Sequence, residues 1–252
     1  MEKAHQLRGK TALVVGASSG VGREVARQLA TAGARVVAVA RGAEALESLA
    51  KETDGIRAVP GDATDAVFAE KLVRDHSPDA IVLLAGVVPK MAAFHELDWD
   101  TFSEAWNNDV KLSFHVMRAA LDLPLRPGST VILGSSGAAI NGSHLSGGYA
   151  GAKRMQWLMA GYAQKHCDAK GLGIRCIAFL PTQLVEGTRT AEIASTTYGA
   201  SLGMSSRAYM DRFEVPIDAS KVAVGIVSAI VGEVPAGVTA VTVSGKGVQP
   251  LP

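Results

Sequence analysis

Short apolar runs alternate along the chain with longer stretches in which apolar residues recur at helical spacing. The run Ala80–Ala85 is apolar at every position, which is typical of a parallel strand covered on both faces. In Val21–Ala32 the apolar residues instead recur every three or four positions, as on the buried face of a helix. The pattern predicts strands at Thr11–Val15, Arg35–Ala40, Ile56–Pro60, Ala80–Ala85, Ser129–Leu133, Gly173–Leu180 and Val238–Val243.

The intervening stretches predict helices, and the alternation predicts an α/β fold. We expect a Rossmann-type, doubly wound, mostly seven-stranded parallel sheet with helices on both faces. No linker divides the chain, so residues 1–252 are predicted to form one domain. The predicted helices cover Val21–Ala32, Ala43–Lys51, Asp65–Asp75, Trp99–Trp106, Val110–Leu121, Tyr149–Lys165 and Ala219–Val231.

The segment 182–220 breaks this rhythm. It is rich in Ser, Thr, Gly and Met and shows no clean period. A long irregular stretch that follows a strand end is often a substrate lid. The alternative is an ordinary surface insertion, and the position after a strand end favours the lid, because ligands of such sheets bind beyond the carboxyl ends of the strands.

Charge and composition exclude several classes of partner. The chain has 25 Lys and Arg against 24 Asp and Glu, so no strong field draws it to nucleic acid or to an anionic membrane. Residues 1–10 lack the apolar stretch of a signal peptide, and the apolar run 222–232 is too short to span a bilayer.

Two cysteines, Cys167 and Cys176, suit free thiols in a reducing compartment. We therefore expect a cytoplasmic protein, and the scattered histidines predict no metal site.

A glycine-rich loop follows the first predicted strand and opens the first predicted helix. Gly16, Gly20 and Gly22 stand in the sequence LVVGASSGVG. Glycine allows a sharp turn and a close backbone approach, and the free N–H groups of the following helix favour an anion. The loop predicts a site for the pyrophosphate of a dinucleotide. The hydroxyls of Ser18 and Ser19 are further donors for a 2′-phosphate on such a cofactor.

Arg41 marks the end of the second predicted strand. A cofactor with a free ribose 2′-hydroxyl usually meets an acidic residue about 20 residues after the glycines begin, but no acid lies between Gly33 and Gly42. A guanidinium instead suits a 2′-phosphate through its charge and forked geometry. The sequence thus favours NADP(H) over NAD(H), the alternative being that Arg41 is a solvated residue at a strand end.

Tyr149 and Lys153 lie four residues apart in a predicted helix and so share a face. An isolated tyrosine has a pKa of about 10, too high for ready proton exchange near neutral pH. A neighbouring ammonium favours the phenolate, so the pair forms a plausible general acid/base. Ser136 closes the fifth predicted strand, thirteen residues before Tyr149.

This order of Ser136, Tyr149 and Lys153 after a GASSGVG loop resembles the short-chain dehydrogenase/reductase family over essentially the whole chain. The resemblance matches Asp62 to an aspartate that contacts adenine, and Pro181 to a turn beside the nicotinamide. It implies an NAD(P)-binding domain whose cofactor-binding residues are Gly16, Ser18, Ser19, Gly20, Val21, Gly22, Arg41, Asp62, Ala63, Ala85, Gly86, Tyr149, Lys153, Pro181 and Leu184.

The resemblance also implies hydride transfer between a nicotinamide and a small-molecule carbonyl or alcohol. Tyr149 would be the proton donor, Ser136 would hold the carbonyl oxygen, and Lys153 would bind the ribose hydroxyls. A homodimer or homotetramer is implied as well. A second hypothesis is a non-catalytic NADP(H)-binding sensor or scaffold.

Three departures from the family pattern stand out. Leu83-Leu84 replaces an Asn-Asn pair, which we interpret as altered scaffolding. Asp109 stands where the family has a fourth catalytic residue, an asparagine linked to the lysine through water; its negative charge would oppose the effect of Lys153 on Tyr149. Pro181-Thr182 replaces the family's Pro-Gly, so the turn lacks the conformational freedom of glycine. Glu186 stands at the position where the family usually has a threonine, and Thr188 lies two residues further on.

The substrate pocket is predicted between the 136–149 loop and the 182–220 segment. His144 lies in the first, where contact with solvent is favoured over contact with substrate. The apolar residues of the second segment indicate that the substrate is an apolar or amphipathic carbonyl compound, or equally that they pack a lid against the body of the protein. Three arginines in the same segment leave a phosphorylated or acidic substrate as an alternative. These residues are Leu184, Tyr198, Leu202, Met204, Tyr209, Met210 and Phe213, with Arg189, Arg207 and Arg212.

Overall fold

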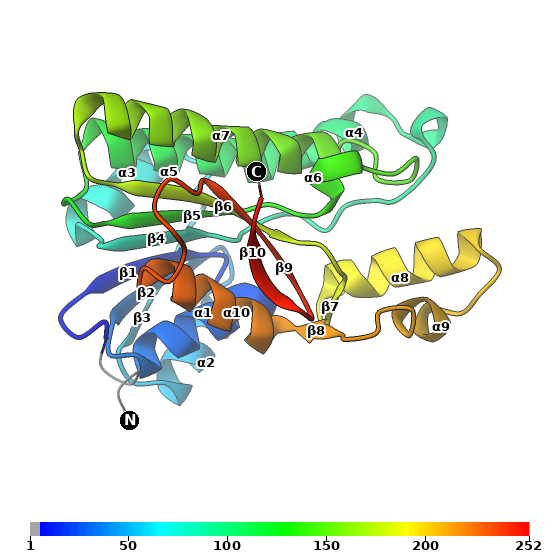
Figure 1. The fold of residues 1–252 in the computed structure, drawn as a ribbon, viewed down its shortest axis with the longest axis horizontal. Helices are drawn as coiled ribbons and strands as arrows, with labels where there is room; N and C mark the ends of the chain where they lie inside the picture. Colours follow the sequence, from blue (N-terminus) through cyan, green and yellow to red (C-terminus); the bar gives the residue numbers. More distant parts are fainter. Residues whose placement is uncertain (1–5, 252) are drawn as a thin grey trace.

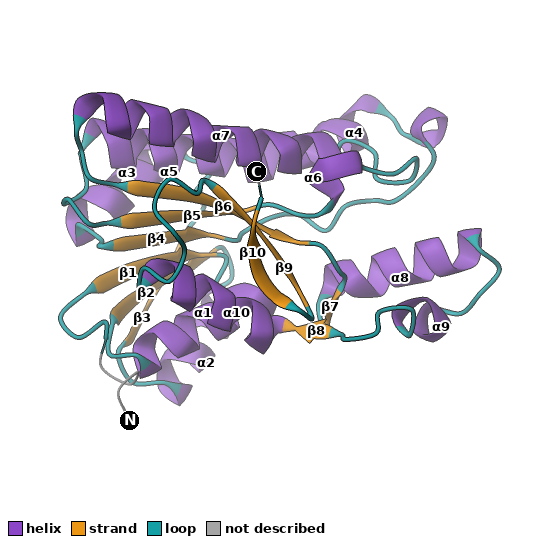
Figure 2. Ribbon diagram, in the orientation of Figure 1, coloured by secondary structure: helices purple, strands orange, loops and turns teal. Residues whose placement is uncertain are grey.

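The computed structural model describes residues 6–251. The predictions for residues 1–10 and for a 1–252 domain therefore fall partly outside the described residues. An eight-stranded sheet forms the centre of the molecule (Figure 2). Its order is β3 (Ile56–Pro60), β2 (Arg35–Ala40), β1 (Thr11–Val15), β4 (Ala80–Leu83), β5 (Thr130–Gly134), β6 (Arg175–Pro181), β9 (Ala240–Ser244) and β10 (Gly247–Pro250).

Seven of these strands run parallel, which confirms the predicted doubly wound sheet. The chain winds outward from β1 in one direction to β3 and in the other from β4 to β9, so that the order reverses between β1 and β4. In an open parallel sheet this switch point creates a crevice at the carboxyl ends of the strands.

Helices cover both faces of the sheet (Figure 1). One apolar core lies between the sheet and α1, α2 and α10, and contains Leu29, Leu46 and Ile226. The other lies under α3, α5 and α7 and contains Leu72, Val116 and Ala163. The helices are α1 (Gly20–Thr31), α2 (Ala43–Glu52), α3 (Ala66–His76), α5 (Lys111–Asp122), α7 (Tyr149–Lys170) and α10 (Ala219–Ile230).

The antiparallel strand β10 was not predicted. It pairs with β9, with Val248 opposite Val243 and Pro250 opposite Val241. Proline removes a donor from the hydrogen-bond ladder, so it argues against a central strand. The segment is nevertheless a strand because it occupies the edge of the sheet.

The helices predicted at Trp99–Trp106 and Val110–Leu121 are present, and the residues between them are helical as well. The α-helix α4 (Trp99–Ala105) passes through a π-helical turn, η3 (Trp106–Val110), directly into α5. Such a turn inserts one residue into a helix and often marks a functional site. It carries Asp109, which is buried there.

The segment 182–220 is more regular than its sequence predicted. It forms a small parallel pair of strands, β7 (Val185–Glu186) and β8 (Ile217–Asp218), with α8 (Arg189–Ser201) and α9 (Ser206–Met210) between them. Figure 1 shows α8 and α9 projecting beyond the sheet. Two short helices, η2 (Phe94–Glu96) and α6 (Ala138–Asn141), complete the set. Among residues 6–251, no helix has the length and apolarity needed to cross a membrane.

Candidate active site

A cavity of about 1150 Å³ opens at the carboxyl ends of the strands. Its wall contains every residue predicted for the site: Ser136, Tyr149, Lys153 and Asp109, together with Gly16, Ser18, Ser19, Gly20, Val21, Gly22, Arg41, Asp62, Ala63, Ala85, Gly86, Pro181 and Leu184. The fold thus brings together residues that are up to 168 positions apart, from Gly16 to Leu184.

The glycine loop between β1 and α1 is packed too tightly for side chains. Gly16 has a φ of +98°, and a Cβ there would overlap the backbone of Ala85. A Cβ on Gly22 would likewise overlap the carbonyl oxygen of Gly16. Ser19 begins α1 without a side-chain cap, and the first turn holds no acidic residue. Its N–H groups are therefore suited to an anionic ligand in the cavity, as a dinucleotide site requires.

Arg41 and Asp62 lie at the same end of the cavity, after β2 and β3. The Asp62 carboxylate accepts a hydrogen bond of 2.9 Å from the N–H of Thr64. This bond, with smaller contributions from Arg41 and Lys111, holds the pKa of Asp62 below its usual value. Arg41 is exposed, so its guanidinium is free to meet a phosphate group.

Ser136 and Tyr149 come from the end of β5 and the first turn of α7. The Ser135 hydroxyl donates a 2.8 Å hydrogen bond to the carbonyl of Lys153, which ties α7 to the end of β5. Tyr149 and Lys153 share a helix face, with the Lys153 Nζ 5.5 Å from the centre of the Tyr149 ring. The predicted acid/base pair therefore has its expected geometry.

Asp109 forms a direct ion pair with Lys153. Its Oδ2 lies 2.9 Å from Lys153 Nζ, and its Oδ1 accepts a 2.9 Å hydrogen bond from the N–H of Val87. The Asp109 side chain is fully buried, and that of Lys153 is only 8% exposed. Gly86 makes room for the pair, since a Cβ there would lie 2.6 Å from Asp109 Oδ2.

Burial alone would lower the pKa of Lys153, because it disfavours the charged ammonium. The Asp109 carboxylate, assisted by Tyr149, opposes burial and raises the pKa of Lys153 above its usual value. Lys153 is therefore charged throughout the neutral range.

The other two departures have structural explanations. Leu83 is fully buried at the end of β4, and Leu84 packs over Gly134, where a Cβ would lie 2.7 Å from its Cδ2. Thr182 has no positive φ, so the turn after Pro181 needs no glycine freedom. Its N–H donates a 2.9 Å hydrogen bond to the carbonyl of Val243.

Of the apolar lid residues singled out in the sequence, only Leu184 and Met210 line the cavity. Three others pack against one another: the rings of Tyr198 and Tyr209 stack at 5.6 Å, and Phe213 meets Tyr209 edge-on at 6.3 Å. Arg189 and Arg207 line the cavity, whereas His144 does not. The aromatic rings of the 182–220 segment thus pack α8 against the α9 region.

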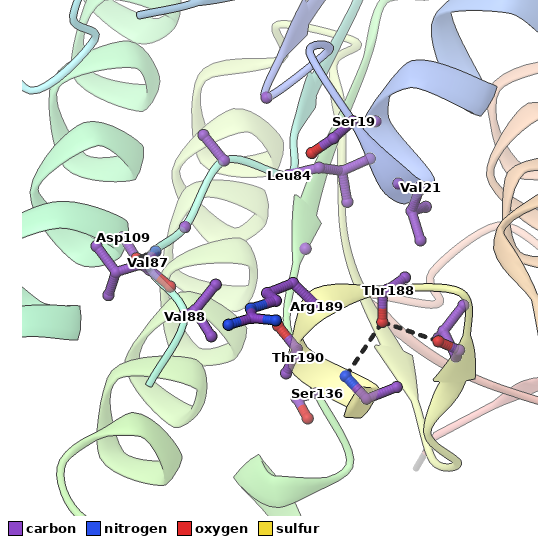
Figure 3. A pocket seen from close by; sticks show the side chains of 18 of the residues that line it. Ser19, Val21, Leu84, Val87, Val88, Asp109, Ser136, Thr188, Arg189 and Thr190 are labelled. Carbon is purple, nitrogen blue, oxygen red and sulfur yellow. Dashed lines mark hydrogen bonds between the residues drawn. The ribbon is translucent and has the colours of Figure 1, made fainter. Parts of the chain in front are cut away.

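Sequence reasoning missed the polar wall that α8 presents to the cavity. Thr188, Thr190 and Glu192 line it together with Arg189. Figure 3 shows Arg189 extending toward Val88, across the cavity from its own segment. The sequence signal that could have predicted the start of this helix is Thr188, a residue type that favours the N-cap position. Its hydroxyl accepts a hydrogen bond from the N–H of Ala191.

Comparison with known proteins identifies the family. The family model described as short chain dehydrogenase matches residues 10–196, which include the glycine loop and the Tyr149–Lys153 pair. The chain belongs to the short-chain dehydrogenase family. Members of this family use a nicotinamide cofactor.

Curated relatives and solved structures are similar to the chain. A 2-keto-3-deoxy-L-fuconate dehydrogenase of Xanthomonas campestris is 33% identical over 53% of this chain and 45% of its own. An uncharacterized short-chain type dehydrogenase/reductase of Sinorhizobium fredii is 32% identical over 69% of each. Bovine L-xylulose reductase is 31% identical over 44% of this chain and 46% of its own. The chain thus spans about half the length of several curated relatives that it matches.

One solved structure is a 3-ketoacyl-(acyl-carrier-protein) reductase from Brucella melitensis complexed with NADH. It superimposes with a TM-score of 0.78 over 95% of this chain and 98% of its own, at 20% identity. At that identity the similarity establishes the shared fold, which confirms the predicted Rossmann-type architecture.

Proposed function

We propose that the protein is an NADP(H)-dependent oxidoreductase that transfers a hydride between nicotinamide and a carbonyl or secondary alcohol. The observation that carries the proposal is that Ser136, Tyr149 and Lys153 line the same cavity as the glycine loop. A dinucleotide with its pyrophosphate at α1 reaches along this cavity toward Tyr149. In this proposal residues 1–252 act as one domain, with 182–220 as the lid over the substrate.

The cofactor supplies the hydride, and the side chains supply position and protons. In the reducing direction, the Tyr149 hydroxyl gives its proton to the carbonyl oxygen as the carbonyl carbon accepts the hydride, and the phenolate then regains a proton from solvent. The Ser136 hydroxyl donates a hydrogen bond to the same oxygen and holds it near Tyr149. Lys153 binds a ribose hydroxyl through its ammonium group.

Arg41 supports NADP(H) as the cofactor rather than NAD(H). It lines the cavity after β2, at the end that holds Asp62. Its forked guanidinium can bind a 2′-phosphate with two parallel hydrogen bonds. No acidic residue stands between Gly33 and Gly42 to bind a free 2′-hydroxyl instead.

The cavity wall supports a small, hydroxylated carbonyl compound as substrate. Leu184 and Met210 provide apolar surface, while Thr190, Arg189 and Glu192 provide donors and acceptors. Relatives named for L-xylulose, D-erythrulose and 2-keto-3-deoxy-L-fuconate agree with this class. The free, buried thiols of Cys167 and Cys176 support a cytoplasmic location, and the family resemblance supports a homodimer or homotetramer.

The test follows NADPH absorbance with a panel of ketoses, α-diketones, aldehydes and quinones. Tyr149→Phe removes the proton donor, and its rate should fall at least about 100-fold. Tyr162→Phe is the matched control, because Tyr162 lies on the same helix, is 58% exposed and is not part of the cavity wall. Its rate should equal that of the wild type.

Equal NADPH consumption by the wild type and Tyr149→Phe would show that turnover does not need the Tyr149 hydroxyl. Tight NADPH binding with no turnover of any panel member by the wild type would count against an oxidoreductase of this substrate class. Such a protein would be a cofactor-binding sensor or scaffold.

A further inference from the structure

The ammonium group of Lys153 has two protein partners. Its Nζ lies 2.9 Å from Asp109 Oδ2 and donates a 2.9 Å hydrogen bond to Gln156 Oε1. A lysine ammonium has three N–H donors. One of them donates to Gln156, while Asp109 Oδ2 faces the ammonium as an ion pair and accepts no hydrogen bond from residues 6–251. Lys153 itself lines the cavity, where a ligand can reach it.

Gln156 follows Lys153 by nearly one turn of α7, so both side chains lie on the same helix face. Its amide is fully buried. The Nε2 group donates hydrogen bonds of 3.2 Å to the carbonyl of Asp109 and 2.8 Å to the Ser113 hydroxyl. That hydroxyl in turn donates a 2.8 Å hydrogen bond to the Asp109 carbonyl.

These contacts connect three elements through one amide. Gln156 belongs to α7, Asp109 to the π-helical turn η3, and Ser113 to α5. A buried amide whose oxygen and nitrogen both have partners is held in one orientation, since turning it would leave polar groups unpaired. The amide oxygen is therefore fixed toward Lys153.

We propose that Gln156 is a positioning residue that holds Lys153 Nζ beside Asp109 and thereby orients the ammonium toward a ligand in the cavity. This role rests on the cofactor site proposed above and adds to it.

The surroundings of Lys153 allow this role to be isolated. The charged or titratable groups acting on it come from Asp109 of η3 and Tyr149 of its own helix. The elements β5 and α5 present Ser135 and Ser113, both of them uncharged hydroxyls. A change at Gln156 therefore alters the position of Lys153 without altering the charge of the site.

The test compares Gln156→Met with Gln164→Met. Methionine keeps the length of the side chain and its helix propensity but removes the amide. Gln164 is the matched control, because it lies on the same helix and its amide accepts a 2.8 Å hydrogen bond from the N–H of Cys176, away from the cavity. Lysine labelled with ¹³C at Cε reports the protonation of Lys153, assigned with Lys153→Met, and fluorescence reports NADPH binding.

In Gln156→Met the titration midpoint of Lys153 should move to lower pH, because the buried ammonium loses an acceptor. NADPH binding should weaken about three- to tenfold, as expected for one misplaced charged hydrogen bond. Gln164→Met should reduce thermal stability and leave both readouts unchanged. An unshifted Lys153 resonance together with unchanged NADPH affinity in Gln156→Met would overturn the positioning role.

If Gln156→Met does not fold, Ser113→Ala tests the same role. This change removes one acceptor of the Gln156 amide and leaves the amide in place, so both effects should appear with the same sign but smaller. Wild-type protein that does not bind NADPH contradicts the cofactor site, whereas the Lys153 titration, recorded without NADPH, still decides the role of Gln156.

Discussion

Asp109 connects three parts of the active site through one carboxylate. One oxygen binds the backbone of Val87 after β4, and the other faces Lys153 of α7. A buried carboxylate is costly unless a positive group compensates it. The family's asparagine position therefore accepts a charge in this chain because Lys153 is already next to it.

The first prediction concerns the stability provided by this pair. Lys153→Met should destabilise the protein by about 3–5 kcal/mol, because it leaves Asp109 buried without a positive partner. The double variant Lys153→Met/Asp109→Asn should recover most of that loss, since the carboxylate charge is gone. Urea unfolding followed by circular dichroism measures both. Lys165→Met, an exposed lysine on the same helix, is the control.

The second prediction concerns cofactor choice. Arg41→Ala should weaken NADPH binding roughly 10- to 100-fold, the effect of losing charge-assisted hydrogen bonds to a phosphate. NADH binding should stay within about twofold, because NADH lacks that phosphate. Fluorescence titrations with both cofactors measure the ratio, and Arg57→Ala, outside the cavity wall, serves as control. A parallel loss of both affinities would mean that Arg41 does not read the 2′-phosphate.

At the scale of elements, a side-chain hydrogen bond joins α8 to the body of the molecule. Ser143 Oγ and Tyr198 Oη lie 2.7 Å apart and join the loop after α6 to α8. That loop leads directly into Tyr149 at the start of α7. The position of the lid and that of the proposed proton donor are therefore coupled.

The third prediction tests this contact. Tyr198→Phe removes the hydroxyl and keeps the ring stacked on Tyr209, so α8 should open more often. If the free energy of opening α8 falls by about 1 kcal/mol, amide hydrogen exchange in α8 should become about fivefold faster. Hydrogen exchange with mass spectrometry measures the rate, and Tyr209→Phe is the control. Unchanged exchange in Tyr198→Phe would show that the hydrogen bond does not hold the lid.

The elements differ in how far the sequence could predict them. The buried parallel strands were predictable because an apolar run such as Ala80–Leu83 has few alternatives. Helix α8 was missed because its buried residues, among them Ala191, Ser195 and Gly199, are small and give a weak apolar stripe. The π-helical turn η3 had no sequence signal.

The candidate site shows the same contrast. Its cavity-lining residues could be predicted because the family motifs carry them in a fixed order. The direct contact between Asp109 and Lys153 could not, since the family resemblance implies a water between the residue at this position and the lysine. Gln156 was missed because a glutamine inside a helix is unremarkable until the fold brings α7 against η3.

At the scale of the whole molecule, Asp79 lies at the amino ends of the central strands β1 and β4, the end of the sheet opposite the cavity. Its Oδ2 accepts a 2.8 Å hydrogen bond from the N–H of Thr11 at the start of β1, and it pairs with Lys10 and Arg126. Burial opposes its charge, but the Thr11 bond and the two cations outweigh burial and lower the pKa of Asp79. The charged form therefore stabilises the fold.

The fourth prediction follows from the sign of that shift. A carboxylate whose pKa is lower in the folded state stabilises the protein above its unfolded pKa of about 3.9, and the contribution disappears as the pH falls through the folded value. Asp79→Asn should lower stability by about 1–3 kcal/mol at pH 7, with the difference shrinking toward pH 3. Thermal unfolding between pH 3 and pH 7 measures it. Asp54→Asn, at an exposed carboxylate, should match the wild type at every pH.

The contact between Gly86, Asp109 and Lys153 restricts which single mutations can accumulate. Exchanging Asp109 for asparagine removes the counter-charge of Lys153, whose side chain is only 8% exposed, and leaves a buried ammonium unpaired. Losing Lys153 alone, or adding a side chain at Gly86, disturbs a fully buried carboxylate. Selection for folding thus preserves the lysine even in a lineage that no longer needs the reaction.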